Sequence, residues 1–166
     1  MLLLGSNLGD RTEVLASARS RLAVEAGRVT ALSREYETAP WGTFVAGEPH
    51  EPFLNQAVAV ETALSATALL DATQRIERAL GRSDHRSEYD PATGDRLYRS
   101  RTLDIDLLFY DSAVIDTPRL TVPHPRLSER RFALEPAAEI WPEYLHPTLK
   151  ISLKELFNSL LLGDSQ

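Results

Sequence analysis

The chain has 166 residues, of which 43% are hydrophobic and 25% charged, which is the size and balance of a single globular domain over residues 1–166. Its formal net charge of -6 argues against general electrostatic binding to nucleic acid or to anionic membranes. The absence of cysteine excludes disulfides and thiolate metal sites, so hard cations such as Mg²⁺, held by oxygen ligands, are the metals to expect.

The N-terminal region predicts a strand followed by a helix. Leu2 to Leu4 form a short apolar run that ends in the turn sequence Gly5-Ser6-Asn7. Asp10 and Glu13 are typical of a helix N-terminus, and the helix ends before Gly27. Residues 29–38 predict a second strand, and residues 39–52 predict a polar loop that contains proline and glycine.

The strand predicted over residues 53–62 has two distinct faces. Leu54, Val58 and Val60 share one face, whereas Phe53 and Asn55 share the other. Phe53 and Asn55 should therefore point the same way.

A second helix is predicted between a cap at Ser65 and Gly81. Gln74 and Glu77 lie to one side of its apolar stripe, one turn apart. Residues 82–100 have no periodicity and are rich in charge, so they predict a long loop. A strand over residues 103–110, a short strand at Val114 and Ile115, and an amphipathic helix after a capping box at Ser152 and Glu155 complete the chain.

This order of elements predicts the fold class. Strand, helix, strand, strand, helix, strand is typical of an α+β fold with a ferredoxin-like antiparallel sheet, a βαββαβ core with helices packed on the sheet, here with a C-terminal extension. Such a fold serves enzymes, RNA binders and small-molecule sensors, so the function must come from particular residues.

The segment SRTLDIDLLFYD, over residues 100–111, is the most informative one. In a strand, Asp104 and Asp106 project from the same face about 6.6 Å apart, while Leu103, Ile105 and Leu107 face the core. Two carboxylates side by side repel each other, but magnesium ions between them would neutralise both. Arginines gather upstream of this pair and again over residues 119–131. Acids that bind magnesium beside arginines match what a nucleoside triphosphate requires.

Several stretches resemble one family in order and in approximate spacing: LGSNLGD, YETAPWG, FLNQAV, TQRIERALGR, SRTLDIDLLFYD and RLTVPHPRLSERRFAL. They are similar to the 6-hydroxymethyl-7,8-dihydropterin pyrophosphokinases of folate synthesis, and they extend over nearly the whole chain. The resemblance implies that the hydroxymethyl oxygen of the pterin attacks the β-phosphorus of ATP and that AMP leaves.

The resemblance also implies roles for individual residues. Two Mg²⁺ ions would bind Asp104 and Asp106, and Arg82, Arg86 and Arg101 would act on the phosphates, with Arg96 and Arg99 as alternatives to Arg86. The residues implied in ATP binding are Gln74, Glu77, Arg101, Arg119, Thr121, His124 and Arg130. Those implied in pterin binding are Thr38, Ala39, Trp41, Phe53, Asn55 and Phe132. Tyr98 stands where many relatives have tryptophan.

Two other functions compete with this one. Another magnesium-dependent nucleotidyl enzyme or a nuclease would use the same aspartates without a pterin, and a noncatalytic ferredoxin-like module would bind RNA. The acidic balance and the lack of an aromatic RNP1 pattern argue against the second.

No apolar run approaches the roughly 20 residues of a membrane span, and no secretory signal pattern begins the chain. We expect a cytoplasmic monomer whose partners are ATP and a reduced pterin, with no membrane or nucleic acid among them.

Overall fold

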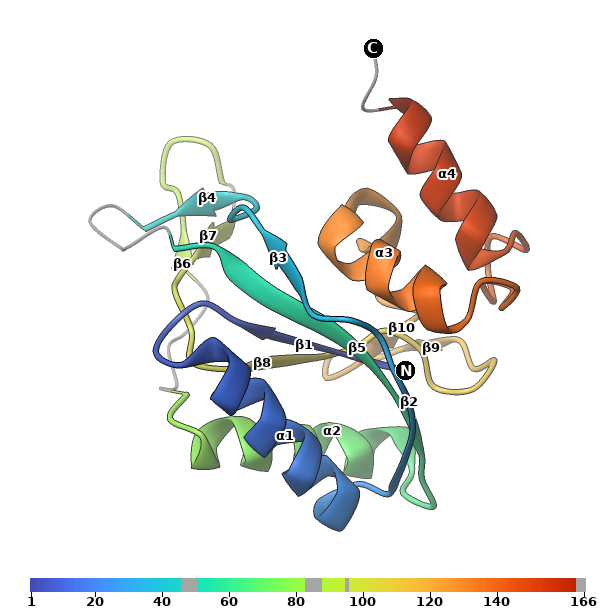
Figure 1. Cartoon of the computed structure of the whole chain (residues 1–166). Helices are drawn as coiled ribbons and strands as arrows, with labels where there is room; N and C mark the ends of the chain where they lie inside the picture. The colour runs from blue at the N-terminus through green and yellow to red at the C-terminus, as the bar shows by residue number, and fades with distance from the viewer. Residues whose placement is uncertain (46–50, 83–87, 95, 164–166) are drawn as a thin grey trace.

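The computed structural model describes residues 1–45, 51–82, 88–94 and 96–163 (Figure 1). Its strands are β1 (Leu2–Ser6), β2 (Arg28–Leu32), β3 (Tyr36–Thr38), β4 (Thr43–Phe44), β5 (Phe53–Glu61), β6 (Glu88–Tyr89), β7 (Arg96–Tyr98), β8 (Asp104–Leu107), β9 (Ile115–Asp116) and β10 (Thr121–Val122). Its α-helices are α1 (Arg11–Glu25), α2 (Ala66–Ala79), α3 (Arg131–Ile140) and α4 (Leu153–Gly163), and a 3₁₀ turn spans Leu127–Glu129.

The main sheet is antiparallel and has the strand order β2-β5-β1-β8, with β3 also paired to β5. The register places Gly5 of β1 opposite Asn55 on one side and opposite Asp104 on the other. This arrangement confirms a mixed α+β fold with an antiparallel sheet.

The strand predicted over residues 29–38 is divided into β2 and β3. Leu32 pairs with Val58, and Tyr36 pairs with Asn55. Three residues separate Leu32 from Tyr36, whereas two residues of β5 separate Asn55 from Val58, so the edge segment has one extra residue here. The Ser33 hydroxyl accepts a hydrogen bond of 2.9 Å from the backbone N–H of Ala57. This N–H lies opposite the extra residue and so has an acceptor there. The prediction of one continuous strand was therefore wrong at this point.

The alternation of β1 separates two hydrophobic cores. Leu2 and Leu4 pack with α1 and α2 on one face of the sheet. Met1 and Leu3 belong to the core on the other face, with residues of α3 and α4. Figure 1 shows α1 and α2 together below the sheet, with α3 and α4 on its other side.

Two segments predicted as irregular loops contain short strands. β4, between β3 and β5, runs parallel to β7, and β7 pairs antiparallel with β6. The segment that precedes β5 is thereby joined to the arginine-rich segment that precedes β8. Strands of two or three residues have no measurable periodicity, so the sequence pattern could not indicate them.

Helix α3 was not predicted, because it contains Pro136 and follows a region rich in proline. A proline inside a helix removes one backbone hydrogen bond and usually interrupts the helix. In this structure α3 nevertheless continues through Pro136, which is buried.

The predicted C-terminal helix is confirmed as α4. Its capping box is formed, since the Glu155 carboxylate accepts from Ser152 N at 2.9 Å and the Ser152 hydroxyl accepts from Glu155 N at 3.2 Å. None of the helices in the described ranges combines the length and apolar character needed to cross a membrane.

Candidate active site

A cavity of about 420 Å³ opens on the face of the sheet that presents Leu3, Gly5 and Asn55, and α2 contributes Gln74 and Glu77 to its lining. It brings together most of the side chains proposed from the sequence: Thr38, Ala39, Trp41, Phe53, Asn55, Gln74, Glu77, Arg82, Arg101, Asp104, Asp106, Arg119, His124, Arg130 and Phe132. Segments far apart in the chain thus meet at one site.

Three predicted or alternative residues are not placed there. Thr121 does not line the cavity, and its hydroxyl donates to Asp116 instead, at 3.3 Å. Arg86 and the side chain of Arg96 lie outside the described residues. Arg99, the other alternative to Arg86, lines the cavity.

The two aspartates share one face of β8, as predicted. Their side chains are 28% and 32% exposed, whereas Leu103, Ile105 and Leu107 are at most 5% exposed and face the core. Asp104 lies opposite Gly5 and Asp106 opposite Leu3, so both carboxylates project over the face that also presents Asn55.

Arginines surround the carboxylate pair. Nη1 of Arg82 and Nη1 of Arg101 each lie 2.9 Å from Oδ1 of Asp104. Nη1 of Arg130 lies 3.7 Å from Oδ2 of Asp106. These cations offset the repulsion between the two acids, and their side chains also line the cavity, where they are available to an anionic ligand.

Glu77 is a third acid at the site. Its side chain is 5% exposed, accepts a hydrogen bond of 2.7 Å from the backbone N–H of Ile105, and forms a close ion pair with Arg82. Burial, followed by the charge of Asp104, raises the pKa of Glu77 to about 7. The same two causes, in the same order, raise the pKa of Asp106 to about 6.

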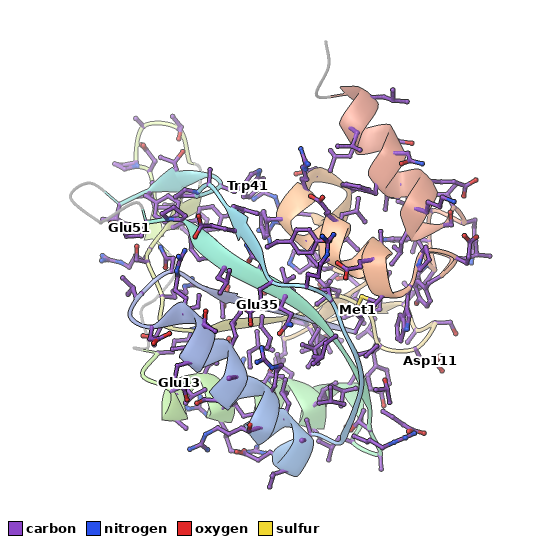
Figure 2. The ribbon with its side chains drawn as sticks, in the orientation of Figure 1. Met1, Glu13, Glu35, Trp41, Glu51 and Asp111 are labelled. Carbon is purple, nitrogen blue, oxygen red and sulfur yellow. The ribbon has the colours of Figure 1, made fainter. Side chains whose placement is uncertain are left out.

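Part of the cavity lining, called here the aromatic end, consists of aromatic side chains. Trp41, Phe44, Phe53, Tyr98 and Phe132 line it. The ring of Trp41 lies 6.0 Å from that of Phe132, and the ring of Phe44 lies 6.4 Å from that of Phe53. Trp41, labelled in Figure 2, follows β3, which pairs with β5. A flat ring system is the ligand that such a wall accommodates.

Two polar groups and one glycine shape the aromatic end. Asn55 is buried, and its amide donates to the hydroxyl of Thr38 at 2.8 Å, which leaves its carbonyl oxygen on the cavity side next to Gly5. A Cβ at Gly5 would lie 3.1 Å from Oδ1 of Asn55 and 3.9 Å from the ring of Phe53. The glycine therefore keeps this part of the floor open.

The ATP-side residues proposed from the sequence have protein partners of their own. Arg119 pairs with Asp71 at 2.6 Å, and Nε2 of His124 lies 3.3 Å from Nη1 of Arg130. The backbone N–H of His124 donates to Leu108 O, which holds the segment after β10 against the end of β8.

Phe44 and Asn7 were missed by sequence reasoning. Phe44 lines the aromatic end of the cavity. Its position three residues after Trp41 is the feature of the sequence that could have indicated this. Asn7 accepts a hydrogen bond of 2.7 Å from the backbone N–H of Arg101 and donates one of 3.0 Å to the Ser100 hydroxyl. The predicted turn at Gly5-Ser6-Asn7 was wrong in part, because β1 continues to Ser6, and it is Asn7, directly after β1, that anchors the base of the arginine-rich segment.

Comparison with known proteins identifies the family. Residues 1–142 match the 7,8-dihydro-6-hydroxymethylpterin-pyrophosphokinases (HPPK). The chain belongs to the HPPK family. A 2-amino-4-hydroxy-6-hydroxymethyldihydropteridine pyrophosphokinase of Porphyromonas gingivalis is 40% identical over 147 residues, which cover 88% of this chain and 92% of that protein. One of Bacillus subtilis is 41% identical over 140 residues, or 84% of this chain and 75% of that protein.

Solved HPPK structures share the fold. A crystal structure of Plasmodium falciparum HPPK-DHPS superposes with a TM-score of 0.73 at 16% identity, over 99% of this chain and 46% of that one. At this identity the likeness is one of fold, and this chain spans less than half of that longer one. The resemblance stated from the sequence motifs is confirmed by the family match.

Proposed function

We propose that this HPPK-family chain transfers pyrophosphate from ATP to 6-hydroxymethyl-7,8-dihydropterin in folate biosynthesis, giving the pterin diphosphate and AMP. The observation that supports this most directly is that one cavity joins an aromatic end, built around Phe53, Asn55 and Phe132, to the acidic and basic end around Asp104. The family match and the names of the curated relatives support the same reaction.

The pterin occupies the aromatic end. Its ring stacks against Phe53 and Phe132, and Asn55 and the backbone near Ala39 bind its polar edge. Trp41 closes this end. Stacking on an aromatic face contributes roughly 0.5–1.5 kcal/mol beyond the burial of area, so two such faces give a flat heterocycle a clear preference for this end.

ATP occupies the end lined by Gln74, Arg119, His124 and Arg130. Arginine suits phosphate because its planar guanidinium donates two parallel hydrogen bonds. Arg82 and Arg101, which pair with Asp104, also contact the phosphates of the bound triphosphate. We also propose, from the family resemblance, that Thr121 takes part in ATP binding and that Arg86 takes part in the transfer.

The donor set fits magnesium. Asp104 and Asp106 offer oxygen ligands only, and no cluster of three or more histidines and acids with metal-binding geometry occurs among the residues that the structure describes. Two carboxylates with phosphate oxygens and water completing the shell is the usual arrangement for Mg²⁺ at a nucleotide. When bound there, two such ions would neutralise charge on the triphosphate and stabilise the attacking and leaving oxygens.

The chemical step is an in-line displacement at the β-phosphorus of ATP. The hydroxymethyl oxygen of the pterin forms a bond to this phosphorus and loses its proton, while the bond from the phosphorus to the oxygen bridging to the α-phosphate breaks and AMP leaves. Arg82, Arg101 and Arg86 offset the negative charge of the transferring group, and the cavity holds the two substrates in contact.

We also propose that the chain is a single domain with the ferredoxin-like βαββαβ topology and that it acts as a cytoplasmic monomer. The strand order β2-β5-β1-β8 with antiparallel neighbours supports the topology.

The test is chromatography of the nucleotides formed by the purified protein. ATP with 6-hydroxymethyl-7,8-dihydropterin and Mg²⁺ should give AMP, and omission of the pterin or chelation of the metal should abolish its formation. AMP formation independent of the pterin, or ADP as the product, would rule out the proposed reaction.

A further inference from the structure

The side chain of Arg126 contacts residues of the candidate active site. The sequence motifs implied no role for Arg126. Its side chain is 45% exposed and does not line the cavity. Its guanidinium carbon lies 4.6 Å from the centre of the Trp41 ring, and its Nη1 donates to the Tyr98 hydroxyl at 3.3 Å. Arg126 therefore contacts two residues of the aromatic end without lining the cavity itself.

Trp41 and Tyr98 come from two different segments of the chain. Trp41 belongs to the segment between β3 and β4, whereas Tyr98 ends β7. Their rings meet edge to face at 5.9 Å. The two segments also pair through β4 and β7, and the Gly42 backbone lies directly against the Tyr98 ring. The wall thus depends on the two segments staying together.

Arg130 touches the same two rings but faces the cavity. It lies 4.9 Å from the centre of the Trp41 ring and donates to the Tyr98 hydroxyl at 3.3 Å, and it is also 3.7 Å from Asp106. If Arg130 binds ATP, as proposed above, its contacts with Trp41 and Tyr98 become weaker. Within the part of the chain that the structure describes, the other side-chain partner of Arg126 is the exposed Glu129, which does not line the cavity.

Tyr98 is the residue that makes this arrangement possible. A phenolic oxygen accepts hydrogen bonds from both guanidinium groups, whereas the indole of a tryptophan at this position has a donor only. The interaction of a guanidinium with an aromatic face adds attraction to Trp41.

We propose that Arg126 is a positioning residue for the pterin, which acts by holding Trp41 of one segment against Tyr98 of the other. This inference rests on the proposed function for the identity of the ligand. It predicts that loss of Arg126 weakens the pterin end of the cavity and leaves the ATP end unchanged.

The first experiment follows Trp41 without turnover. In a Trp141→Phe background, Trp41 is the one remaining tryptophan. Acrylamide quenching of its fluorescence should increase on Arg126→Ala and should be partly restored by Arg126→Lys, which retains the charge near the ring. Arg131→Ala is the matched control, because Arg131 is exposed and pairs with Glu135 on α3.

The second experiment measures steady-state kinetics in the otherwise unchanged chain. Arg126→Ala should raise KM for the pterin about tenfold, the effect of losing a partly desolvated cation–π contact together with a hydrogen bond, while KM for ATP and the melting temperature stay near those of the unchanged chain. Tyr98→Phe should raise it less, and the double variant should show less than the product of the two single effects, because both changes remove the same contact.

Three results would overturn the proposal: unchanged quenching and pterin KM, an equal rise in both KM values, or a fall in melting temperature that accounts for the kinetic loss. The first would mean that Trp41 is held without Arg126, and the other two would give Arg126 a general structural role. Failure of the unchanged chain to form AMP would contradict the proposed function instead, and the quenching would still decide whether Arg126 holds Trp41.

Discussion

The carboxylate of Glu77 accepts a 2.7 Å hydrogen bond from the backbone N–H of Ile105, the residue that separates Asp104 from Asp106. β8 is the last strand on its side of the main sheet, so this N–H bond ties the strand to α2. The same carboxylate pairs with Arg82. Glu77 therefore fixes the backbone between the two proposed metal ligands as well as one of the proposed catalytic arginines.

Glu77→Ala should lower both stability and turnover. It leaves a buried N–H without its acceptor, which costs about 1–3 kcal/mol in the free energy of unfolding. Glu77→Gln keeps an oxygen acceptor and should lose less stability, while still lowering turnover because Arg82 loses its charged partner. Urea denaturation and initial rates measure the two effects. Glu61→Gln, which breaks the exposed pair with Arg28, is the control and should change neither.

Asp104→Ala and Asp106→Ala should each lower kcat on the order of a hundredfold or more, because each removes a charged group that acts on the transferring phosphates. Neither change removes core packing, since both side chains point into the cavity. Circular dichroism should show an intact fold, and calorimetry should show weaker binding of ATP with Mg²⁺. Activity close to that of the unchanged chain in either variant would remove that aspartate from the metal site.

Gly5→Ala should weaken pterin binding selectively. The added Cβ would crowd Oδ1 of Asn55 at 3.1 Å and reach the ring of Phe53. Overpacking at a tight site typically costs 1–3 kcal/mol, so we expect the pterin Kd to rise about tenfold with little change for ATP. Gly163→Ala, which has open space around it, is the matched control. Equal losses for both ligands would show that the change disturbs the sheet and not the pocket floor.

The side chain of Asp106 should make the free energy of unfolding depend on pH. Burial and the charge of Asp104 raise the pKa of Asp106 to about 6, against about 3.9 for an unperturbed aspartate. Between these values the folded chain binds the proton more tightly than the unfolded chain, so the free energy of unfolding falls as pH rises from about 4 to 6 and then levels off for this group. In metal-free buffer, melting temperatures of Asp106→Asn should fall less over this range. Parallel curves for the variant and the unchanged chain would contradict the shift.

The parts of the site that the sequence predicted are those set by local geometry. A period of two residues places Asp104 with Asp106 and Phe53 with Asn55 wherever the strands lie in the sheet. The meeting of these two pairs on one face depends on the register of β1 with both neighbours, which alternation within one strand does not determine. That juxtaposition came into the prediction only through the family resemblance.

Other features depended on tertiary contacts. Glu77 looked like a residue on one side of a helix, and only the packing of α2 beside β8 makes it an acceptor for Ile105. The pairing of β4 with β7 joins segments separated by more than fifty residues, and it contains too few residues to leave a pattern. In the sequence, Arg126 looks like an ordinary surface residue. Only the tertiary structure places it beside Trp41 and Tyr98.

The fate of the oxygen that bridges the α- and β-phosphates of ATP distinguishes pyrophosphate transfer from nucleotidyl transfer. Attack of the pterin alcohol on the β-phosphorus, which is the reaction proposed from the family match, leaves an ¹⁸O label at this bridge in the AMP product, where mass spectrometry detects it. A nucleotidyl transfer enzyme using the same aspartates would attack the α-phosphorus and release the label in pyrophosphate. We expect the label in AMP, with pterin diphosphate as the other product; label in pyrophosphate would rule out transfer of pyrophosphate to the pterin.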